Sequence, residues 1–164
     1  GSAALAGMGQ AGAELATLVK TQVLAKGAVN VVVANLPDVA QTPFAMSLDA
    51  PTRGLVNNLV TTFNSQLQAG LAGTSVLYVD AYTQGRDQYT NPSKYGISNV
   101  TTPACSTTSP ANPLGGSSIA CTAASTVPGD TSTFLFADSV HPTPLGYQLQ
   151  AAFVIAQMRA AGWL

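Results

Sequence analysis

The fold is decided by residues 29–36, whose sequence is VNVVVANL. This near-continuous run of β-branched residues predicts a strand that is buried on both faces, as the strands of parallel sheets are, and Pro37 ends it. Upstream, residues from about Gly9 to Lys26 carry apolar side chains at helical spacing, and Gly27 stands where a C-cap glycine belongs. A helix followed by a buried strand is the unit of a parallel α/β sheet.

The same order is repeated downstream. Residues from Pro51 to about Leu71 follow the three-four spacing of an amphipathic helix, and residues 75–80, SVLYVD, supply a second short strand that ends at Asp80. Pro144 to Ala161 predicts a last amphipathic helix. Short connections between alternating helices and strands favour one doubly wound sheet over an all-α or all-β fold.

The region from about Tyr89 to Thr133 breaks this pattern, because it is rich in Pro, Ser, Thr and Gly and has no sustained period. Loops of this length are usually functional covers or poorly ordered segments. Cys105 and Cys121 both lie in it, and we expect them to form a disulfide that stabilises the loop by about 3 kcal/mol. A disulfide indicates an oxidising compartment; the alternative is two unrelated thiols of a cytosolic protein.

Composition excludes several classes of function. The chain is 46% hydrophobic and 8% charged, which is typical of a globular domain. A formal net charge of -1 gives no field that would gather nucleic acid or an anionic membrane. No window has the roughly 18 uninterrupted apolar residues of a transmembrane helix, and a signal peptide is either absent or already removed. The chain therefore reads as soluble, with no nucleic-acid partner and no transmembrane segment.

The segment that carries chemistry is residues 134–147, FLFADSVHPTPLGY. Asp138 and His141 lie three positions apart in a turn before a proline-started helix, and His141 is the only histidine. An imidazole can take the proton of a serine nucleophile, while a carboxylate fixes its tautomer and stabilises the imidazolium. Three alternatives remain at this point: Asp138 as a turn former, His141 as a surface loop residue, or the pair as half of a metal site that lacks further ligands.

Several blocks resemble the GDSL or SGNH family of esterases and lipases. Residues 138–143, DSVHPT, are similar to the last block of this family, D-x-x-H-P-T. Residues 30–43 resemble its central strand and following loop, and residues 63–67, FNSQL, are similar to its F-N-x-x-L helix. Residues 91–96 resemble the entry into the cysteine-bearing loop of bacterial secreted and autotransporter-type esterases.

The resemblance implies a flavodoxin-like three-layer α/β/α sandwich with a parallel sheet. It implies that Asp138 is the acid and His141 the base of a serine ester hydrolase, which acts on an ester or lipid substrate through an acyl-enzyme. Neither a metal nor an organic cofactor is implied. The expected location is secreted, periplasmic or on the cell surface of a bacterium.

The family's nucleophile lies in a G-D-S block, and its oxyanion donors lie in two further blocks that include G-x-N-D. None of these occurs here, and Gly1-Ser2 and Gly116-Ser117 lack the aspartate and the strand-to-helix context. We therefore interpret residues 1–164 as the C-terminal part of a single SGNH hydrolase domain, with a loop insertion at about 89–133. An N-terminal chain or region would supply the serine and the oxyanion hole.

Two other functions remain open for the same fold: a non-catalytic binding or surface module, and an acyltransferase. The substrate-binding residues are unknown from the sequence. The aromatic candidates for the wall of an acyl pocket, each of which could equally be a packing residue, are Phe44, Tyr82, Tyr89 and Tyr95.

Overall fold

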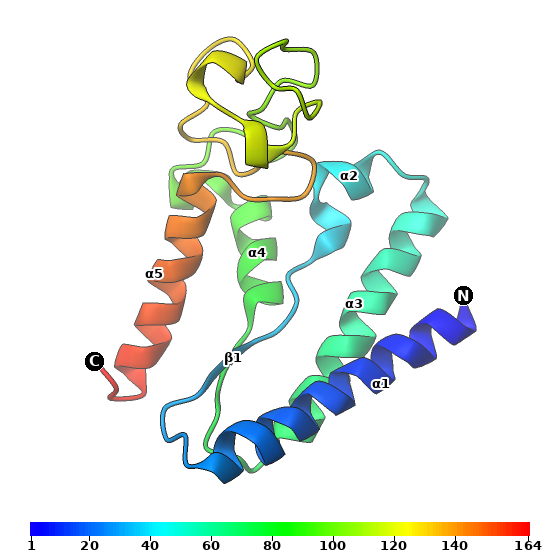
Figure 1. Ribbon diagram of the computed structural model, residues 1–164, viewed down its shortest axis with the longest axis vertical. Helices are drawn as coiled ribbons and strands as arrows, with labels where there is room; N and C mark the ends of the chain where they lie inside the picture. The colour runs from blue at the N-terminus through cyan, green and yellow to red at the C-terminus, as the bar shows by residue number, and fades with distance from the viewer. The chain divides into compact units, whose positions relative to one another are not determined.

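The computed structural model describes residues 1–164, which divide into two compact units. The first unit comprises Gly1–Ala40, Asp49–Gly85 and Val154–Leu164, and the second comprises Gln41–Leu48 and Arg86–Phe153. The α-helices are α1 (Ser2–Leu18), α2 (Pro43–Met46), α3 (Ala50–Leu71), α4 (Ala81–Thr90) and α5 (Pro144–Ala160) (Figure 1). The strands are β1 (Val32–Ala34) and β2 (Leu77–Val79). None of the helices combines the length and hydrophobicity needed to cross a lipid bilayer.

The two strands form a parallel pair, in which Val33 lies opposite Tyr78. A parallel pair needs a crossover connection, and α3 provides it between β1 and β2. The predicted α/β class with a parallel sheet is therefore confirmed.

Helices α1 and α3 lie side by side in the first unit (Figure 1). Their contact is close because it contains glycines: a Cβ added to Gly12 would lie 2.3 Å from the Phe63 carbonyl oxygen. The core of this unit is formed by Ala16, Val19, Leu67 and Leu71. Side chains from the strand segments, among them Val31, Val33 and Tyr78, pack against it.

The helix ends follow local sequence signals. After α1 the chain continues through a π-helical turn, Val19–Val23, and a 3-10 turn, Leu24–Lys26, and it ends at Gly27 with a φ of 95°. The predicted end at Gly27 is confirmed, although the helix begins at Ser2 rather than near Gly9. Helix α3 begins where Asp49 accepts a hydrogen bond from the Thr52 N–H at 2.8 Å.

The prediction that residues 29–36 form a strand buried on both faces is wrong. Strand β1 has three residues, Ala34 is exposed, and Val29 is 80% exposed. The sheet has only two strands, so each strand is hydrogen-bonded along one edge. Successive side chains alternate between the faces of a strand, and Val31 and Val33 take the face that packs on the helical core.

Helix α4 has no counterpart among the elements predicted from the sequence, because its residues, AYTQGRDQYT, include few apolar side chains. A capping interaction starts it: Asp80 accepts hydrogen bonds from the Thr83 N–H at 3.0 Å and the Thr83 hydroxyl at 2.7 Å. Asp80 also accepts a bond of 2.8 Å from the Asn35 side chain, directly after β1. Asp80 is thus a strand-end cap that joins β2 to the end of β1.

The second unit contains mostly irregular chain. Between α4 and α5 its only helices are three short 3-10 segments, Pro92–Tyr95, Ser118–Ala120 and Ala123–Ser125. Its core is formed by Ile97, Leu135 and Phe136, against which Leu145 and Leu149 of α5 pack. The predicted disulfide between Cys105 and Cys121 is present, with a Cα–Cα distance of 5.8 Å.

Candidate active site

The candidate site is built on a tight turn at residues 137–142. The Ala137 N–H donates to the His141 carbonyl at 2.8 Å, and Phe136 pairs with Pro142 in an isolated antiparallel bridge. Inside the turn, Oδ1 of Asp138 accepts the backbone N–H groups of Val140 at 2.9 Å and His141 at 2.7 Å. Aspartate favours such turns because its side chain satisfies backbone donors two and three residues on.

This turn directs the imidazole onto the carboxylate. Nδ1 of His141 lies 3.0 Å from Oδ1 and 2.9 Å from Oδ2 of Asp138. An ionised carboxylate can only accept, so Nδ1 carries the hydrogen and the neutral ring keeps its lone pair on Nε2. No hydrogen bond within the chain involves Nε2, and the His141 side chain is 58% exposed. The lone pair of a base is thus presented outward.

The carboxylate of Asp138 is held in its charged form. Burial, which leaves this residue 8% exposed, raises its pKa. The hydrogen bonds from the His141 N–H, the Ser118 hydroxyl and the backbone N–H groups of Val140 and Ser118 more than offset this effect. The net pKa of Asp138 lies well below its usual range, so the residue is an anion at neutral pH.

Thr143 and Gly146 secure the chain that follows His141. The buried Thr143 donates its hydroxyl to the Phe134 carbonyl at 2.6 Å and accepts the Gly146 N–H at 3.2 Å. A Cβ on Gly146 would lie 2.7 Å from the Pro142 Cβ and 3.0 Å from the Leu135 carbonyl oxygen. The start of α5 therefore packs directly on the turn, and this close approach explains the glycine.

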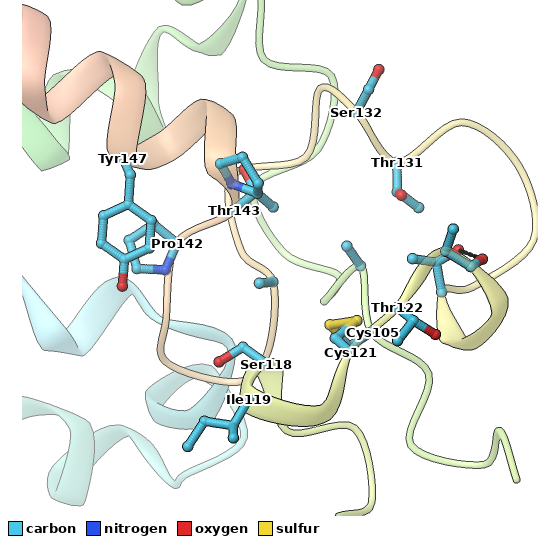
Figure 2. Close-up of a pocket in the computed structure, with 15 residues that line it drawn as sticks. Cys105, Ser118, Ile119, Cys121, Thr122, Thr131, Ser132, Pro142, Thr143 and Tyr147 are labelled. Carbon is cyan, nitrogen blue, oxygen red and sulfur yellow. Dashed lines mark hydrogen bonds between the residues drawn. A yellow bond between two sulfur atoms is a disulfide. The ribbon is translucent and has the colours of Figure 1, made fainter. Parts of the chain in front are cut away.

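Two cavities flank the Cys105–Cys121 loop. One of about 310 Å³ is lined by His141 and Asp138, together with Val140, Leu114 and Gly116. The other, of about 620 Å³, is shown in Figure 2, where Tyr147 and Pro142 stand opposite Thr122, Thr131 and Ser132. Ser118 and Ile119 line this larger cavity from the disulfide loop, and no charged side chain lines it.

The aromatic residues considered as pocket walls, Phe44, Tyr82, Tyr89 and Tyr95, line neither of these two cavities. The Tyr82 hydroxyl donates to the Asn57 side chain at 2.7 Å, and the Tyr95 hydroxyl hydrogen-bonds to Asp87. Tyr147, in the first turn of α5, is the aromatic residue of the larger cavity. Its position in the first turn of the helix that follows the His141 turn is the sequence signal that could have identified it.

No serine hydroxyl of the chain hydrogen-bonds to the His141 ring. Ser117 of the Gly116-Ser117 pair accepts the Ile119 N–H at 3.4 Å. Ser118 faces the carboxylate rather than the imidazole, with its N–H 2.9 Å from Oδ2 of Asp138. The structure thus brings Asp138 and His141 together and adds Ser118, for which the sequence held no signal.

Comparison with known proteins identifies the family of the chain. The family described as GDSL-like lipase/acylhydrolase matches residues 7–154. A GDSL esterase/lipase of Arabidopsis thaliana is 34% identical over 110 residues, which cover 67% of this chain and 29% of that protein. A second Arabidopsis thaliana GDSL esterase/lipase is 31% identical over 157 residues, covering 84% of this chain and 40% of its own.

The chain thus spans well under half the length of these two relatives. Both are plant proteins, whereas residues 91–96 had suggested bacterial secreted or autotransporter-type esterases. The comparisons support the family and do not support that bacterial subgroup.

Proposed function

The chain belongs to the GDSL-like lipase/acylhydrolase family. We propose that it supplies the aspartate and histidine of a Ser-His-Asp mechanism that hydrolyses carboxylic esters. One observation carries this proposal: the buried Asp138 carboxylate binds Nδ1 of His141 while Nε2 faces outward. This is the arrangement in which an imidazole accepts a proton from a serine and returns it to a leaving group.

The reaction follows from that geometry. Nε2 of His141 takes the hydroxyl proton as the serine oxygen bonds to the ester carbonyl carbon, and the carbonyl π electrons move onto the oxygen. When the tetrahedral intermediate collapses, the carbon–alkoxy bond breaks and the alkoxide leaves with the proton from Nε2. Water then attacks the acyl-serine by the same proton transfer, which releases the acid and restores the serine. Asp138 remains ionised and stabilises the imidazolium.

The serine and the oxyanion-hole donors belong to an N-terminal chain or region in this proposal, and residues 1–164 form the C-terminal part of the hydrolase. The coverage of 29% and 40% of the two relatives supports this division. The Cys105–Cys121 disulfide supports a secreted or cell-surface location, because disulfides persist in oxidising compartments.

The proposed substrate is an ester or lipid whose uncharged acyl or alcohol portion occupies the larger cavity, which is lined by Pro142, the residue after His141. Side chains that line the larger cavity are apolar or hydroxyl-bearing, so the cavity offers no counterion for a charged group. Burying an unpaired charge there would be costly, whereas acyl or alcohol portions without charge can be buried.

The test is turnover of short-chain nitrophenyl esters by the protein together with the region that carries the nucleophile. We expect His141→Ala to remove nearly all activity, and retained activity in this variant would contradict the proposal. Mass spectrometry of the active sample identifies whether a second polypeptide is present. Addition of a competing alcohol separates the alternatives: an acyltransferase forms a new ester, a hydrolase forms free acid, and a binding module turns over neither.

A further inference from the structure

The Cys105–Cys121 loop reaches the candidate acid through one residue, Ser118. Oδ1 of Asp138 is occupied by the backbone donors of its own turn, Val140 and His141. Oδ2 instead accepts the N–H of Ser118, which is 20 residues away in the sequence, at 2.9 Å. The two carboxylate oxygens are therefore held from different parts of the chain.

The disulfide restrains the chain on the C-terminal side of Ser118. It begins the 3-10 helix Ser118–Ala120, which leads directly to Cys121. The disulfide joins Cys121 to Cys105, whose own N–H donates to the Ala137 carbonyl at 2.8 Å. Because Ala137 precedes Asp138, the crosslink ties the loop to the same stretch of backbone that carries the acid.

Hydrogen bonds and close packing restrain the chain on the N-terminal side of Ser118. The side-chain N–H of Asn112, a residue that is 4% exposed, donates to the Ser117 carbonyl at 3.0 Å, and its Oδ1 accepts the Leu114 N–H at 3.1 Å. Gly116 lies between them with a φ of +89°, and a Cβ there would lie 2.9 Å from the Thr107 Cγ2. A buried amide and a glycine at a close approach thus fix the chain that leads into Ser118.

Fixing both oxygens fixes the plane of the carboxylate. With Oδ1 alone held, the carboxylate could turn about its terminal torsion, which is broad for aspartate. The exposed ring of His141 makes its hydrogen bonds to Asp138 alone, so the carboxylate determines which ring nitrogen carries the hydrogen. A wrong tautomer would place the hydrogen on Nε2, where the base needs a lone pair.

We propose that Ser118, held between Asn112 and the Cys105–Cys121 disulfide, is a positioning residue that orients the Asp138 carboxylate and so maintains the Nδ1–H tautomer of His141. Its importance for turnover rests on the proposed function, but the tautomer itself is a property of this chain.

The tautomer can be measured directly, because His141 is the only histidine of the chain. Long-range ¹H–¹⁵N spectra of the ¹⁵N-labelled chain distinguish the Nδ1–H and Nε2–H forms when they are recorded at a pH where the ring is neutral. The same spectra show when that condition is met. We expect the Nδ1–H form to dominate in the wild type.

Ser118→Pro is the decisive variant. It removes the N–H that reaches Asp138, and proline suits the first position of a helical turn whose preceding residue, Ser117, has an extended ψ of 136°. Ser118→Ala keeps this N–H and removes only the hydroxyl. Ala123→Pro is the matched control, because it places proline at the first position of the neighbouring 3-10 helix, Ala123–Ser125.

We expect the ratio of Nδ1–H to Nε2–H to fall about fivefold or more in Ser118→Pro, as is typical when a hydrogen bond to a charged group is lost. The fall should be smaller in Ser118→Ala, and the ratio should stay at the wild-type value in Ala123→Pro. An unchanged ratio in Ser118→Pro with a native amide spectrum would overturn the proposal. If that variant does not fold, an unchanged ratio in Ser118→Ala overturns it instead.

The two proposals fail in different ways. A changed tautomer in Ser118→Pro, with no esterase activity in the wild-type assembly, would contradict the proposed function and support the positioning role. Full esterase activity in the wild type, with an unchanged tautomer in the variant, would contradict the positioning role alone.

Discussion

Nδ1 of His141 lies almost equally close to the two oxygens of Asp138, at 3.0 Å and 2.9 Å. Both oxygens of the carboxylate therefore face Nδ1 of the ring. The same oxygens accept backbone N–H groups from the turn and from Ser118, so hydrogen bonds from the protein compensate for the water that burial removes. This explains how a buried carboxylate can remain charged beside a base.

Replacement of Asp138 by asparagine should lower kcat about 10³- to 10⁴-fold. The amide keeps the shape of the carboxylate but not its charge, and an NH₂ group turned toward Nδ1 stabilises the wrong tautomer of His141. Nitrophenyl ester turnover by the assembled protein measures this. A loss of less than tenfold would show that Asp138 does not serve as the acid of the triad.

Removal of the disulfide by the double variant Cys105→Ala/Cys121→Ala should lower the free energy of unfolding by about 3 kcal/mol. The crosslink restricts the unfolded chain, and the loop it closes has little apolar core of its own. Urea unfolding followed by circular dichroism measures the change. An unchanged unfolding midpoint would show that the hydrogen bonds from Ala104 and Cys105 to residues 136 and 137 hold the loop without it.

Asp87 should make stability fall at acid pH. Hydrogen bonds from Lys94, then Tyr95 and Asn91, lower its pKa to about 2, below the unfolded value of 3.8. A lowered folded-state pKa contributes stability that is present above the unfolded value and is lost as pH falls toward 2. Asp87→Asn should therefore flatten the pH dependence of the urea midpoint between about pH 4 and pH 2. The effect is small because the Asp87 side chain is partly exposed, and Glu14→Gln, which removes an exposed carboxylate from α1, controls for general charge effects.

The contact between α1 and α3 can be tested with a glycine pair in one helix. Gly12→Ala should destabilise the protein by about 1–3 kcal/mol, because the new Cβ would lie 2.3 Å from the Phe63 carbonyl oxygen. Gly7→Ala, with nothing within 4 Å, should stabilise it by about 0.5–1 kcal/mol through helix propensity. Thermal unfolding of the two variants should shift in opposite directions; shifts of the same sign would contradict the close packing at Gly12.

The F-N-x-x-L block, residues 63–67, contains an asparagine whose role only the structure reveals. Asn64 of this block is buried, and its side chain accepts the Leu36 N–H at 2.9 Å and donates to the Leu36 carbonyl at 2.8 Å. The sequence predicted the helix that carries Asn64 but gave no sign of its partner, because Leu36 lies 28 residues earlier. Asn64 satisfies backbone groups just after β1 that would otherwise be unpaired.

Local signals were sufficient for much of this protein. The three-four spacing of apolar residues predicted α3 and α5, and Gly27 predicted a helix end. A spacing of three residues made Asp138 and His141 a candidate pair, and the resemblance to the D-x-x-H-P-T block gave the two residues their expected roles. Each of these features depends on side chains that lie within about one helical turn of one another, so neighbouring residues determine whether the feature forms.

Only the tertiary structure decided the features that depend on the path of the chain. Whether residues 29–36 are covered on one face or two depends on how many strands and helices surround them. Helix α4 has few apolar residues and begins at a cap from Asp80. The second oxygen of Asp138 finds its donor in Ser118, which reaches it because a disulfide and a buried asparagine bend the loop back. Contacts of this kind need loop closure over many residues, and no local pattern encodes which closure the chain adopts.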